Sequence, residues 1–280
     1  MAYTSVNNSK LECRLCPHNC NISDGDSGIC SIRKNNNMNL ELPFKGILSA
    51  INIDPIEKKP LYQFYPGSQI LSLGFYGCNF HCPFCQNYSI SQVFHTNNNK
   101  SYISPSEIVQ IAVDKGIPSI AYTYSEPVIH FEYVMDCAVL AHKKGLKNVL
   151  VTNGFLNPEP AKELLLEMDA VNVDLKAFTN EFYHELGGRI EPVKTFIKLA
   201  SELTHLEVTT LIIPGKNDSE KEIMSIANFI ASIDSNIPLH LSAYYPVFKY
   251  EISTTPKDTI LELCDKVSRI LKYVYPGNIF

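Results

Sequence analysis

The sequence predicts an α/β fold built on a parallel sheet. From about residue 100 to the end of the 280-residue chain, short apolar runs rich in β-branched residues alternate with amphipathic segments of helical length. Such alternation is typical of parallel strands joined by right-handed helical crossovers. Polar residues also stand where successive apolar runs end. Because the carboxyl ends of parallel strands converge in barrel-like folds, these polar positions are expected to share one site.

The strands and helices can be placed from these patterns. The first strand is expected in the apolar run 70–77, and five more are expected at 119–124, 148–152, 170–175, 206–213 and 239–244. Helices are expected at 104–115, 128–144, 158–168, 180–186, 191–203, 219–233 and 256–273. The first helix opens with Ser104, a proline and Glu107 in the order of a capping box, and Gly145 ends the second helix.

Composition and charge narrow the class of partner. Hydrophobic residues make up 45% of the chain, which is enough for an ordinary core, and the formal net charge is −5. A chain of negative charge has no general attraction to a polyanion. Short lysine clusters such as Lys58-Lys59 are interpreted as solvated faces. No nucleic-acid partner is therefore expected.

The amino-terminal sequence and the distribution of cysteines indicate the cellular compartment of the protein. Residues 1–10 are polar and lack the apolar core of a signal peptide, and no apolar run reaches the length of a membrane span. Seven of the nine cysteines fall in two groups before residue 86. The other two, Cys137 and Cys264, lie in helical patterns as small hydrophobes. A cytoplasmic protein with reduced thiols and no membrane association is expected.

The most informative group of residues is Cys78, Cys82 and Cys85, directly after the first expected strand. No fourth cysteine follows closely in the sequence. Structural zinc sites and simple electron-transfer clusters take four protein ligands, so three thiolates indicate a metal centre with one position open for chemistry. The alternative is three structural cysteines or part of a zinc ribbon.

A second group, Cys13, Cys16, Cys20 and Cys30, lies in a segment poor in large apolar residues. Such a segment cannot stabilise itself by burial, so the four thiolates are interpreted as a metal staple. Zinc, a second iron-sulfur cluster and unmetallated thiols are the open alternatives. The chain is accordingly divided into a cysteine-rich metal-binding extension with its connector, residues 1–65, and a core barrel, residues 66–280.

The core triplet resembles the motif of the radical SAM superfamily, Cys-x3-Cys-x-aromatic-Cys, with Phe84 as the aromatic residue. The resemblance implies a partial (β/α)6 TIM-like barrel with the motif after its first strand. It also implies that Cys78, Cys82 and Cys85 hold a 4Fe-4S cluster whose fourth iron binds S-adenosylmethionine (SAM). Reductive cleavage of SAM then yields a 5′-deoxyadenosyl radical that abstracts hydrogen from a substrate. An anaerobic oxidoreductase supplied by a reductant such as flavodoxin or ferredoxin is implied.

Nearly the whole chain is similar to one branch of that superfamily, the radical SAM component of the AmmeMemoRadiSam system, often labelled as similar to pyruvate formate-lyase activating enzyme. The similarity rests on Cys-Arg-Leu-Cys-Pro-His-Asn-Cys at 13–20, Asp-Pro-Ile-Glu-Lys-Lys-Pro-Leu-Tyr at 54–62, Pro-Gly-Ser at 66–68, and Cys-Gln-Asn at 85–87 followed by Ile-Ser-Gln at 90–92. It implies a protein substrate or partner proteins of that system.

The resemblance also implies residues that bind the cofactor. Ser125 and Glu126 occupy the place of the superfamily's Gly-Gly-Glu-Pro motif, which binds the methionyl amine of SAM, although Tyr124-Ser125 replaces the two glycines. The charge of Glu126 suits an ammonium partner. Asn153, Asp174 and Lys176 correspond to positions that contact the ribose and carboxylate of SAM in relatives. His240 corresponds to a position near the adenine and the substrate.

Three classes of function are compatible with these features. A radical enzyme of unassigned substrate is preferred. A glycyl-radical activase is the first alternative, but such activases place additional cysteines after the core triplet, whereas this chain has four before it. A non-catalytic iron-sulfur or zinc protein for binding or electron transfer is the second alternative, and the open three-cysteine site argues against it. RNA modification is disfavoured by the charge.

Overall fold

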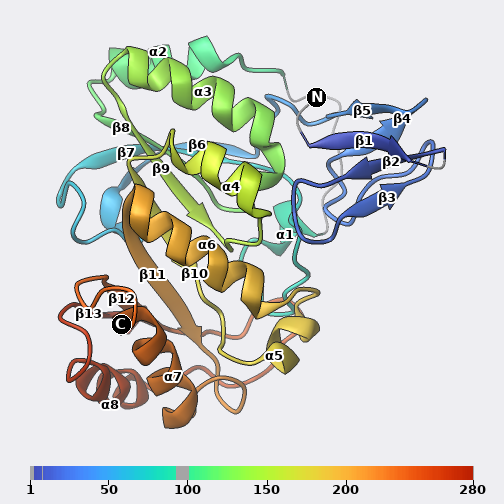
Figure 1. Ribbon diagram of the computed structural model, residues 1–280. Helices are drawn as coiled ribbons and strands as arrows, with labels where there is room; N and C mark the ends of the chain where they lie inside the picture. The colour runs from blue at the N-terminus through green and yellow to red at the C-terminus, as the bar shows by residue number, and fades with distance from the viewer. Residues whose placement is uncertain (1–2, 8, 93–100, 280) are drawn as a thin grey trace.

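The centre of the fold is an open eight-stranded sheet. The computed structural model describes residues 3–7, 9–92 and 101–279. The strand order is β13-β12-β11-β10-β9-β8-β7-β6 (Figure 1). Neighbours from β7 to β13 are parallel, whereas β6 runs antiparallel to β7. Within the described chain β6 and β13 do not pair, so the barrel is partial. The predicted α/β class is confirmed.

All six predicted strands are present. They are β7 (Gln69–Gly74), β8 (Ser119–Thr123), β9 (Lys147–Thr152), β10 (Ala170–Asp174), β11 (His205–Ile212) and β12 (Leu239–Ala243). The sequence patterns do not predict the two edge strands, β6 (Ala50–Pro55) and β13 (Val274–Gly277). Both contain a proline and mix polar with apolar residues, so neither has the apolar run that marks a central strand.

The seven predicted helices are present in the predicted order. They are α2 (Pro105–Asp114), α3 (Phe131–Lys143), α4 (Pro158–Leu165), α5 (Asn180–Glu185), α6 (Ile190–Leu203), α7 (Glu220–Ala231) and α8 (Lys257–Val267). One short helix, α1 (Tyr88–Ser91), was not predicted. A 3-10 turn, η2 (Pro127–His130), begins the predicted helix 128–144. The capping box of α2 is confirmed, since Ser104 and Glu107 exchange hydrogen bonds. The last helix is shorter than predicted, because the chain turns after Val267 to lay β13 beside β12.

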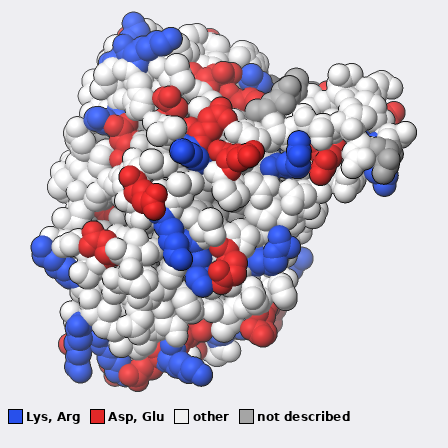
Figure 2. All heavy atoms as spheres, viewed as in Figure 1, with Lys and Arg blue, Asp and Glu red and all other residues white. Residues whose placement is uncertain are grey.

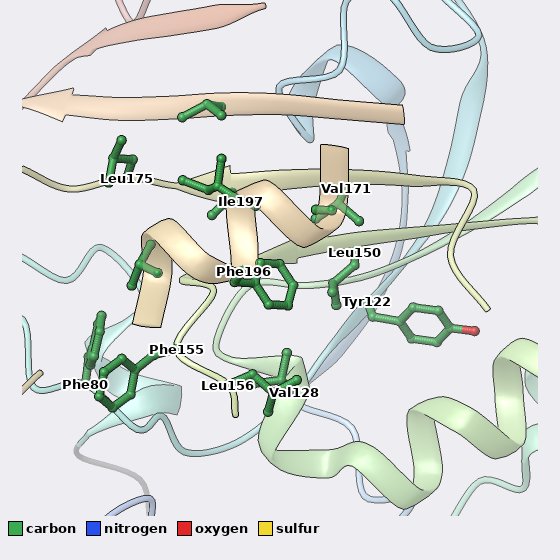
Figure 3. Close-up of a cluster of buried hydrophobic side chains, with 14 of the residues drawn as sticks. Phe80, Tyr122, Val128, Leu150, Phe155, Leu156, Val171, Leu175, Phe196 and Ile197 are labelled. Carbon is green, nitrogen blue, oxygen red and sulfur yellow. The ribbon is translucent and has the colours of Figure 1, made fainter. Parts of the chain in front are cut away.

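The outer face of the sheet packs against the helices. Tyr122 of β8, Leu150 of β9 and Val171 of β10 belong to one large buried core. Figure 3 shows this core together with Phe196 and Ile197 of α6, which cover the strands. A parallel sheet covered in this way needs nearly continuous apolar strands, which is why those strands could be recognised from the sequence.

The inner face of the sheet carries the opposite set of strand side chains. Near the amino ends of the strands it holds a small apolar cluster formed by Ile56, Leu61, Ile70, Ala121, Val149 and Ala170. Further along the strands the inner face becomes polar, with Asp174, Thr209 and His240 in register on β10, β11 and β12. Residues in register on parallel strands point to the same side. Asp174 ends β10 and so lies at the mouth of the partial barrel, whereas His240 is the second residue of β12 and lies deeper.

The cysteine-rich extension is a small β-structure beside the core, drawn in blue in Figure 1. It contains a three-stranded antiparallel sheet and a hairpin, formed by β1 (Thr4–Asn7), β2 (Lys10–Cys13), β3 (Cys20–Ile22), β4 (Lys34–Asn36) and β5 (Asn39–Glu41). Asn157 donates its backbone N–H to the carbonyl of Leu15 at 3.1 Å. The buried guanidinium of Arg33 makes two 2.8 Å hydrogen bonds to the carboxylate of Glu132 in α3. The boundary at residue 65 stays a prediction.

The surface agrees only partly with expectation. Acidic and basic side chains are interspersed on the face drawn in Figure 2. Among the described residues, no helix is both long enough and apolar enough to span a bilayer.

The prediction that Lys58 and Lys59 are both solvated is wrong at one position. The side chain of Lys58 is 67% exposed, but that of Lys59 is 2% exposed and bonds to Asp54 at 2.8 Å. Lys59 is buried because this carboxylate supplies its counter-charge inside the fold.

Candidate active site

The three core cysteines lie in the loop that leaves the carboxyl end of β7. Cys82 is buried, whereas Cys78 and Cys85 are partly accessible. The loop is fixed at its start by a 2.9 Å hydrogen bond from the N–H of Gly77 to the carbonyl of Ile90. The predicted order of strand, cysteine loop and helix is therefore present, and it places all three thiols at the mouth of the partial barrel.

The surroundings of these thiols favour their neutral form. Burial raises the pKa of Cys78 well above its ordinary value and raises the pKa of Cys82 to about 12. The thiols are also close enough that each, when ionised, would repel the next. The ammonium of Lys176 acts in the opposite direction on Cys82. A metal centre supplies the positive charge that buried thiolates need, so this donor set fits an iron-sulfur cluster.

Glu126 lies just beyond the end of β8 and is only 2% exposed. Its carboxylate accepts hydrogen bonds from Oγ1 of Thr152 at 2.6 Å, from the N–H of Asn153 at 2.8 Å and from the N–H of Val128 at 3.3 Å. Burial raises the pKa of Glu126 to about 7, although the three hydrogen bonds act in the opposite direction. A buried carboxylate that ionises near neutral pH is well suited to receive a cationic group.

Asn153 connects the end of β9 to the cysteine loop. Its Nδ2 donates to Oδ1 of Asn79 at 2.8 Å and lies 3.7 Å from Sγ of Cys78. Its Oδ1 accepts from the N–H of Phe155 at 2.8 Å, which fixes the orientation of the amide. Because the N–H of Asn153 also binds Glu126, the ends of three successive strands meet in one cluster. The binding roles of these residues stay predictions.

Asp174 ends β10, Lys176 lies two residues further on, and the two form an ion pair. Nζ of Lys176 lies 3.0 Å from Oδ2 of Asp174, and the backbone N–H of Lys176 donates to the hydroxyl of Tyr183. Burial alone would lower the pKa of Lys176, but Asp174 and Cys82 outweigh burial and hold this pKa above its ordinary value. The site therefore keeps a positive charge beside the thiol of Cys82.

Ser125 contributes a polar atom with no partner. Its Oγ is buried and makes no hydrogen bond to any described residue. Burying a hydroxyl without a partner is costly, so such atoms are uncommon in folded proteins. The hydroxyl lies next in sequence to Glu126 and is free to bind a ligand.

His240 has a different set of contacts. It lies on the inner face in register with Thr209 and, beyond it, Asp174. Its Nε2 is 2.6 Å from Oε2 of Glu207, and its ring packs edge-on against Tyr62 with 4.9 Å between the ring centres. These contacts run toward the connector that follows β6 and not toward the cysteine loop. A role for His240 near the adenine or the substrate stays a prediction.

The four amino-terminal cysteines gather around one turn of the extension. Cys13 and Cys20 face each other across β2 and β3, and Cys16 lies in the turn between these strands. Burial raises the pKa of Cys16 to about 12, and Cys30, Cys13 and Cys20 would raise it further when ionised. In the part of the chain that the structure describes, no three His, Cys, Asp or Glu side chains are arranged around a single metal ion. Metal binding by this group stays a prediction.

A pocket of about 290 Å³ lies where the extension meets the cysteine loop. Cys78 and Ser91 line it from the core, Ile29 and Ser31 line it from the extension, and Lys249 lines it from the segment after β12. The pocket thus opens beside Cys78. It also shows that the extension forms part of the wall around the core cysteines.

Several residues of this region were not predicted from the sequence. They are Asp54, Lys59, Asn79, Thr152 and Glu207. Asn79 and Thr152 adjoin predicted site residues, so the polarity of the strand ends was a usable signal for them. Asp54 and Lys59 fall in a segment whose prolines and charges suggest a surface linker, and Glu207 lies inside an apolar strand. Nothing in the local pattern distinguishes these three from ordinary polar residues.

Comparison with known families gives the class of this protein. The family model of the radical SAM superfamily matches residues 73–230, from the end of β7 into α7. This stretch contains the cysteine loop, Glu126, Asn153 and the pair Asp174 and Lys176. The chain therefore belongs to the radical SAM superfamily. Membership implies an enzyme that binds a 4Fe-4S cluster and SAM.

Two related sequences differ in how much of their own length the match covers. An uncharacterized protein of Methanocaldococcus jannaschii is 38% identical over 284 residues, which cover 100% of this chain and 84% of that protein. A GTP 3′,8-cyclase of Aliarcobacter butzleri is 26% identical over 160 residues, which cover 55% of this chain and 49% of the cyclase. The chain thus spans about half the length of the cyclase that it matches.

Solved structures share the fold at low sequence identity. TYW1 with a lysine-pyruvate adduct bound has a TM-score of 0.55 and 16% identity, and the match covers 96% of this chain and 86% of TYW1. Streptococcus suis SuiB bound to S-adenosylmethionine has a TM-score of 0.58 and 16% identity, over 73% of this chain and 48% of SuiB. These likenesses support the partial barrel.

Proposed function

We propose that this protein cleaves SAM reductively at a 4Fe-4S cluster held by Cys78, Cys82 and Cys85. The observation that carries the proposal is the position of these thiols at the mouth of the barrel, where Asn153 links Cys78 to the buried carboxylate of Glu126. When bound, the cluster and SAM supply a 5′-deoxyadenosyl radical that takes a hydrogen atom from the substrate. Three thiols without a fourth leave one cluster position for SAM.

We assign the polar residues around the loop to the amino-acid and ribose parts of SAM. Ionised Glu126 pairs with the methionyl ammonium through a charge-assisted hydrogen bond. The unpartnered hydroxyl of Ser125 makes a second contact with the same end of the molecule. Lys176 attracts the methionyl carboxylate, while Asn153 and Asp174 offer hydrogen bonds to the ribose hydroxyls. Each assignment matches the charge or the hydrogen-bonding capacity of the side chain.

The substrate is unassigned, and we place it on the inner face near His240. Similarity to the AmmeMemoRadiSam component favours a protein substrate or partner proteins. One fold relative, SuiB, has been solved bound to its precursor peptide SuiA, so the same architecture serves a peptide in that protein. A reductant such as flavodoxin or ferredoxin and a cytoplasmic location, where thiols stay reduced, belong to this proposal.

A glycyl-radical activase of the pyruvate formate-lyase activating type is the second candidate. The overall similarity supports it. The four cysteines of the extension weigh against it, because they precede the core triplet instead of following it. We assign Cys13, Cys16, Cys20 and Cys30 to a second metal site, either zinc or an iron-sulfur cluster, within an extension at 1–65 that docks on a core at 66–280.

The decisive experiment measures SAM cleavage by the reconstituted protein. After anaerobic loading with iron and sulfide, wild-type protein with dithionite and SAM should release 5′-deoxyadenosine slowly even without a substrate. Replacing Cys78, Cys82 and Cys85 with Ala should abolish this release and remove about four iron per chain. A non-catalytic metal protein would neither bind SAM nor cleave it.

A matched control is available within the same chain. Cys137 is buried in α3 and Cys264 lies in α8, so the double variant Cys137→Ala, Cys264→Ala removes two thiols without touching the mouth of the barrel. This variant should keep the full iron content and the full rate. If wild-type protein with a complete and reducible cluster makes no 5′-deoxyadenosine, the proposed function is wrong.

A further inference from the structure

Tyr124 has an unusual backbone conformation next to the proposed SAM site. Its φ angle is +70°, in the left-handed region that glycine enters freely and that bulky residues rarely adopt. Tyr124 directly follows β8 and directly precedes Ser125 and Glu126. A non-glycine residue keeps such a conformation only where its surroundings hold it there.

The phenol ring of Tyr124 is held by a buried ion pair. Its hydroxyl donates to Oδ2 of Asp54 at 2.6 Å and accepts from Nδ2 of Asn52 at 3.2 Å. Nζ of Lys59 lies 4.4 Å from the centre of the ring and 2.8 Å from the same Asp54 oxygen. Asp54 and Lys59 are both at least 95% buried. The ring therefore has a cation on its face and an anion at its hydroxyl.

The backbone of Tyr124 is held from the other side by the cysteine loop. Nδ2 of Asn87, two residues after Cys85, donates to the carbonyl of Tyr124 at 2.5 Å. The N–H of Ser125 turns back to the carbonyl of Thr123 at 3.0 Å. The peptide unit between Tyr124 and Ser125 is thus fixed at both ends, and its orientation determines where the buried hydroxyl of Ser125 points.

The neighbouring strand is fitted to the same ring. A Cβ added to Gly74, at the end of β7, would lie 2.5 Å from Oγ of Ser49 and 3.0 Å from Cδ2 of Tyr124. The second distance is shorter than an ordinary contact between carbon atoms, so a side chain at this position would press on the ring as well as on Ser49. The end of β7 and the end of β8 are therefore complementary around Tyr124.

We propose that Tyr124, anchored by Asp54 and Lys59, is a positioning residue that directs Ser125 and Glu126 toward the amino-acid end of SAM. This inference rests on the proposed function. The ion pair acts through the tyrosine and does not itself touch SAM. A glycine at this position could also adopt a positive φ, but it would remain free to adopt other conformations. The anchored phenol of Tyr124 holds the backbone in this one conformation.

The first test compares Tyr124→Phe with Tyr122→Phe. Tyr122 lies in β8, two residues before Tyr124, but its hydroxyl bonds to Asn148 on the outer face, so its loss should leave SAM binding unchanged. Tyr124→Phe loses the hydrogen bond to Asp54 and should weaken SAM binding about tenfold, with iron content unchanged. The measurements are equilibrium dialysis of SAM and the change that SAM causes in the electron paramagnetic resonance spectrum of the reduced cluster.

The second test separates positioning from simple packing. Tyr124→Ala lacks the anchor and disfavours positive φ, whereas Tyr124→Gly lacks the anchor but accepts positive φ. Positioning therefore predicts that the Ala variant binds SAM more weakly than the Gly variant, and both more weakly than wild type. Lost ring packing alone predicts equal affinities for the Ala and Gly variants, and that result would overturn the proposal.

A third variant covers the case in which changes at Tyr124 prevent folding. Ser125→Ala removes a hydroxyl that has no protein partner, so the melting temperature should stay the same while SAM binds about three- to tenfold more weakly. Unchanged affinity in Ser125→Ala or in Tyr124→Phe overturns the positioning role and leaves the proposed function intact. If wild-type protein with a complete cluster does not bind SAM at all, both fail together.

Discussion

A Cβ added to Gly77 would lie 2.6 Å from the carbonyl oxygen of Cys30. Gly77 precedes the first core cysteine, and Cys30 is the last cysteine of the extension. The two segments are joined again next to this contact, since Nε2 of His18 lies 2.8 Å from the carbonyl oxygen of Asn79. The two groups of cysteines therefore lie in segments that pack directly against each other.

Gly77→Ala should separate the extension from the core. Gly77 has a φ of +75° and no room for a methyl group, so the substitution adds both backbone strain and a collision. We expect a loss of about 3 kcal/mol in the free energy of unfolding, with faster proteolysis of residues 1–65. Urea denaturation and limited proteolysis check this.

The control for this change is Gly67→Ala. Gly67 has a similar φ of +79° but open space around its Cα. Its replacement by Ala therefore adds backbone strain without a collision. Its cost should be about 1 kcal/mol. Equal losses in the two variants would show that the close packing of Gly77 against Cys30 and Ile32 does not contribute to stability.

SAM binding should strengthen as the pH rises toward 7. The pKa of Glu126 is raised to about 7 by burial, so below that pH the carboxyl is mostly protonated and cannot pair with an ammonium. Affinity should rise by up to about tenfold per pH unit between pH 5.5 and 6.5 and then level off. Equilibrium dialysis of the cluster-loaded protein measures this, with iron content checked at each pH. Glu126→Gln should bind more weakly and with little pH dependence, and a slope as steep as that of wild type would contradict the assignment.

The same carboxyl should make the cluster-free protein less stable at high pH. Its pKa in the folded protein, about 7, lies above its ordinary value of 4.5. The stabilisation it gives is therefore complete below pH 4.5 and is lost as the pH rises through 7. The change amounts to about 3 kcal/mol. Unfolding curves at pH 4.5 and 7.5 should show wild type losing stability relative to Glu126→Gln, and a parallel response of the two proteins would contradict this.

The amino-terminal cysteines should bind metal independently of the core triplet. In the variant with Ala at Cys78, Cys82 and Cys85, metal analysis should still find about one zinc ion, or the iron of a second cluster. Chelation of that metal should destabilise the turn around Cys16 without separating the extension from the core, because Leu15, Ile22 and Ile32 are buried in the same apolar core as the barrel. A triple variant that contains neither zinc nor iron would leave the four cysteines as plain thiols.

Lys59→Met should destabilise the protein much more than Lys58→Met. Both lysines bond to Asp54, but Lys59 approaches it inside the fold, whereas the side chain of Lys58 is 67% exposed. Removing Lys59 leaves a buried carboxylate without its main counter-charge, at a cost of about 3 kcal/mol. Lys58→Met should unfold at nearly the same urea concentration as wild type, because solvent screens that pair. Similar midpoints for the two variants would mean that Asp54 does not depend on the buried lysine.

The sequence predicts the parts of the fold that are periodic. Strands β7 to β12 are buried by helices and read as apolar runs, and the cysteine spacing marks the mouth of the barrel. The sequence does not predict β6, because that strand contains polar residues that point to the inner face of the sheet. There Asp54 contacts Lys59 and Tyr124. The contact of Asp54 with Tyr124 joins residues far apart in the sequence. It depends on the path of the connector across the sheet, which no local sequence pattern predicts. The contact between His240 and Glu207 escaped prediction because it depends on the register of β11 and β12, which the sequence does not specify.

The contact between the extension and the cysteine loop limits what can reach the core cysteines. With Cys30 against Gly77, the opening beside Cys78 is a pocket of about 290 Å³. A pocket of this size admits ions and small molecules but not a folded carrier protein. We therefore expect iron and sulfide in solution to load the folded chain, whereas handover from a carrier protein would need the extension to move away.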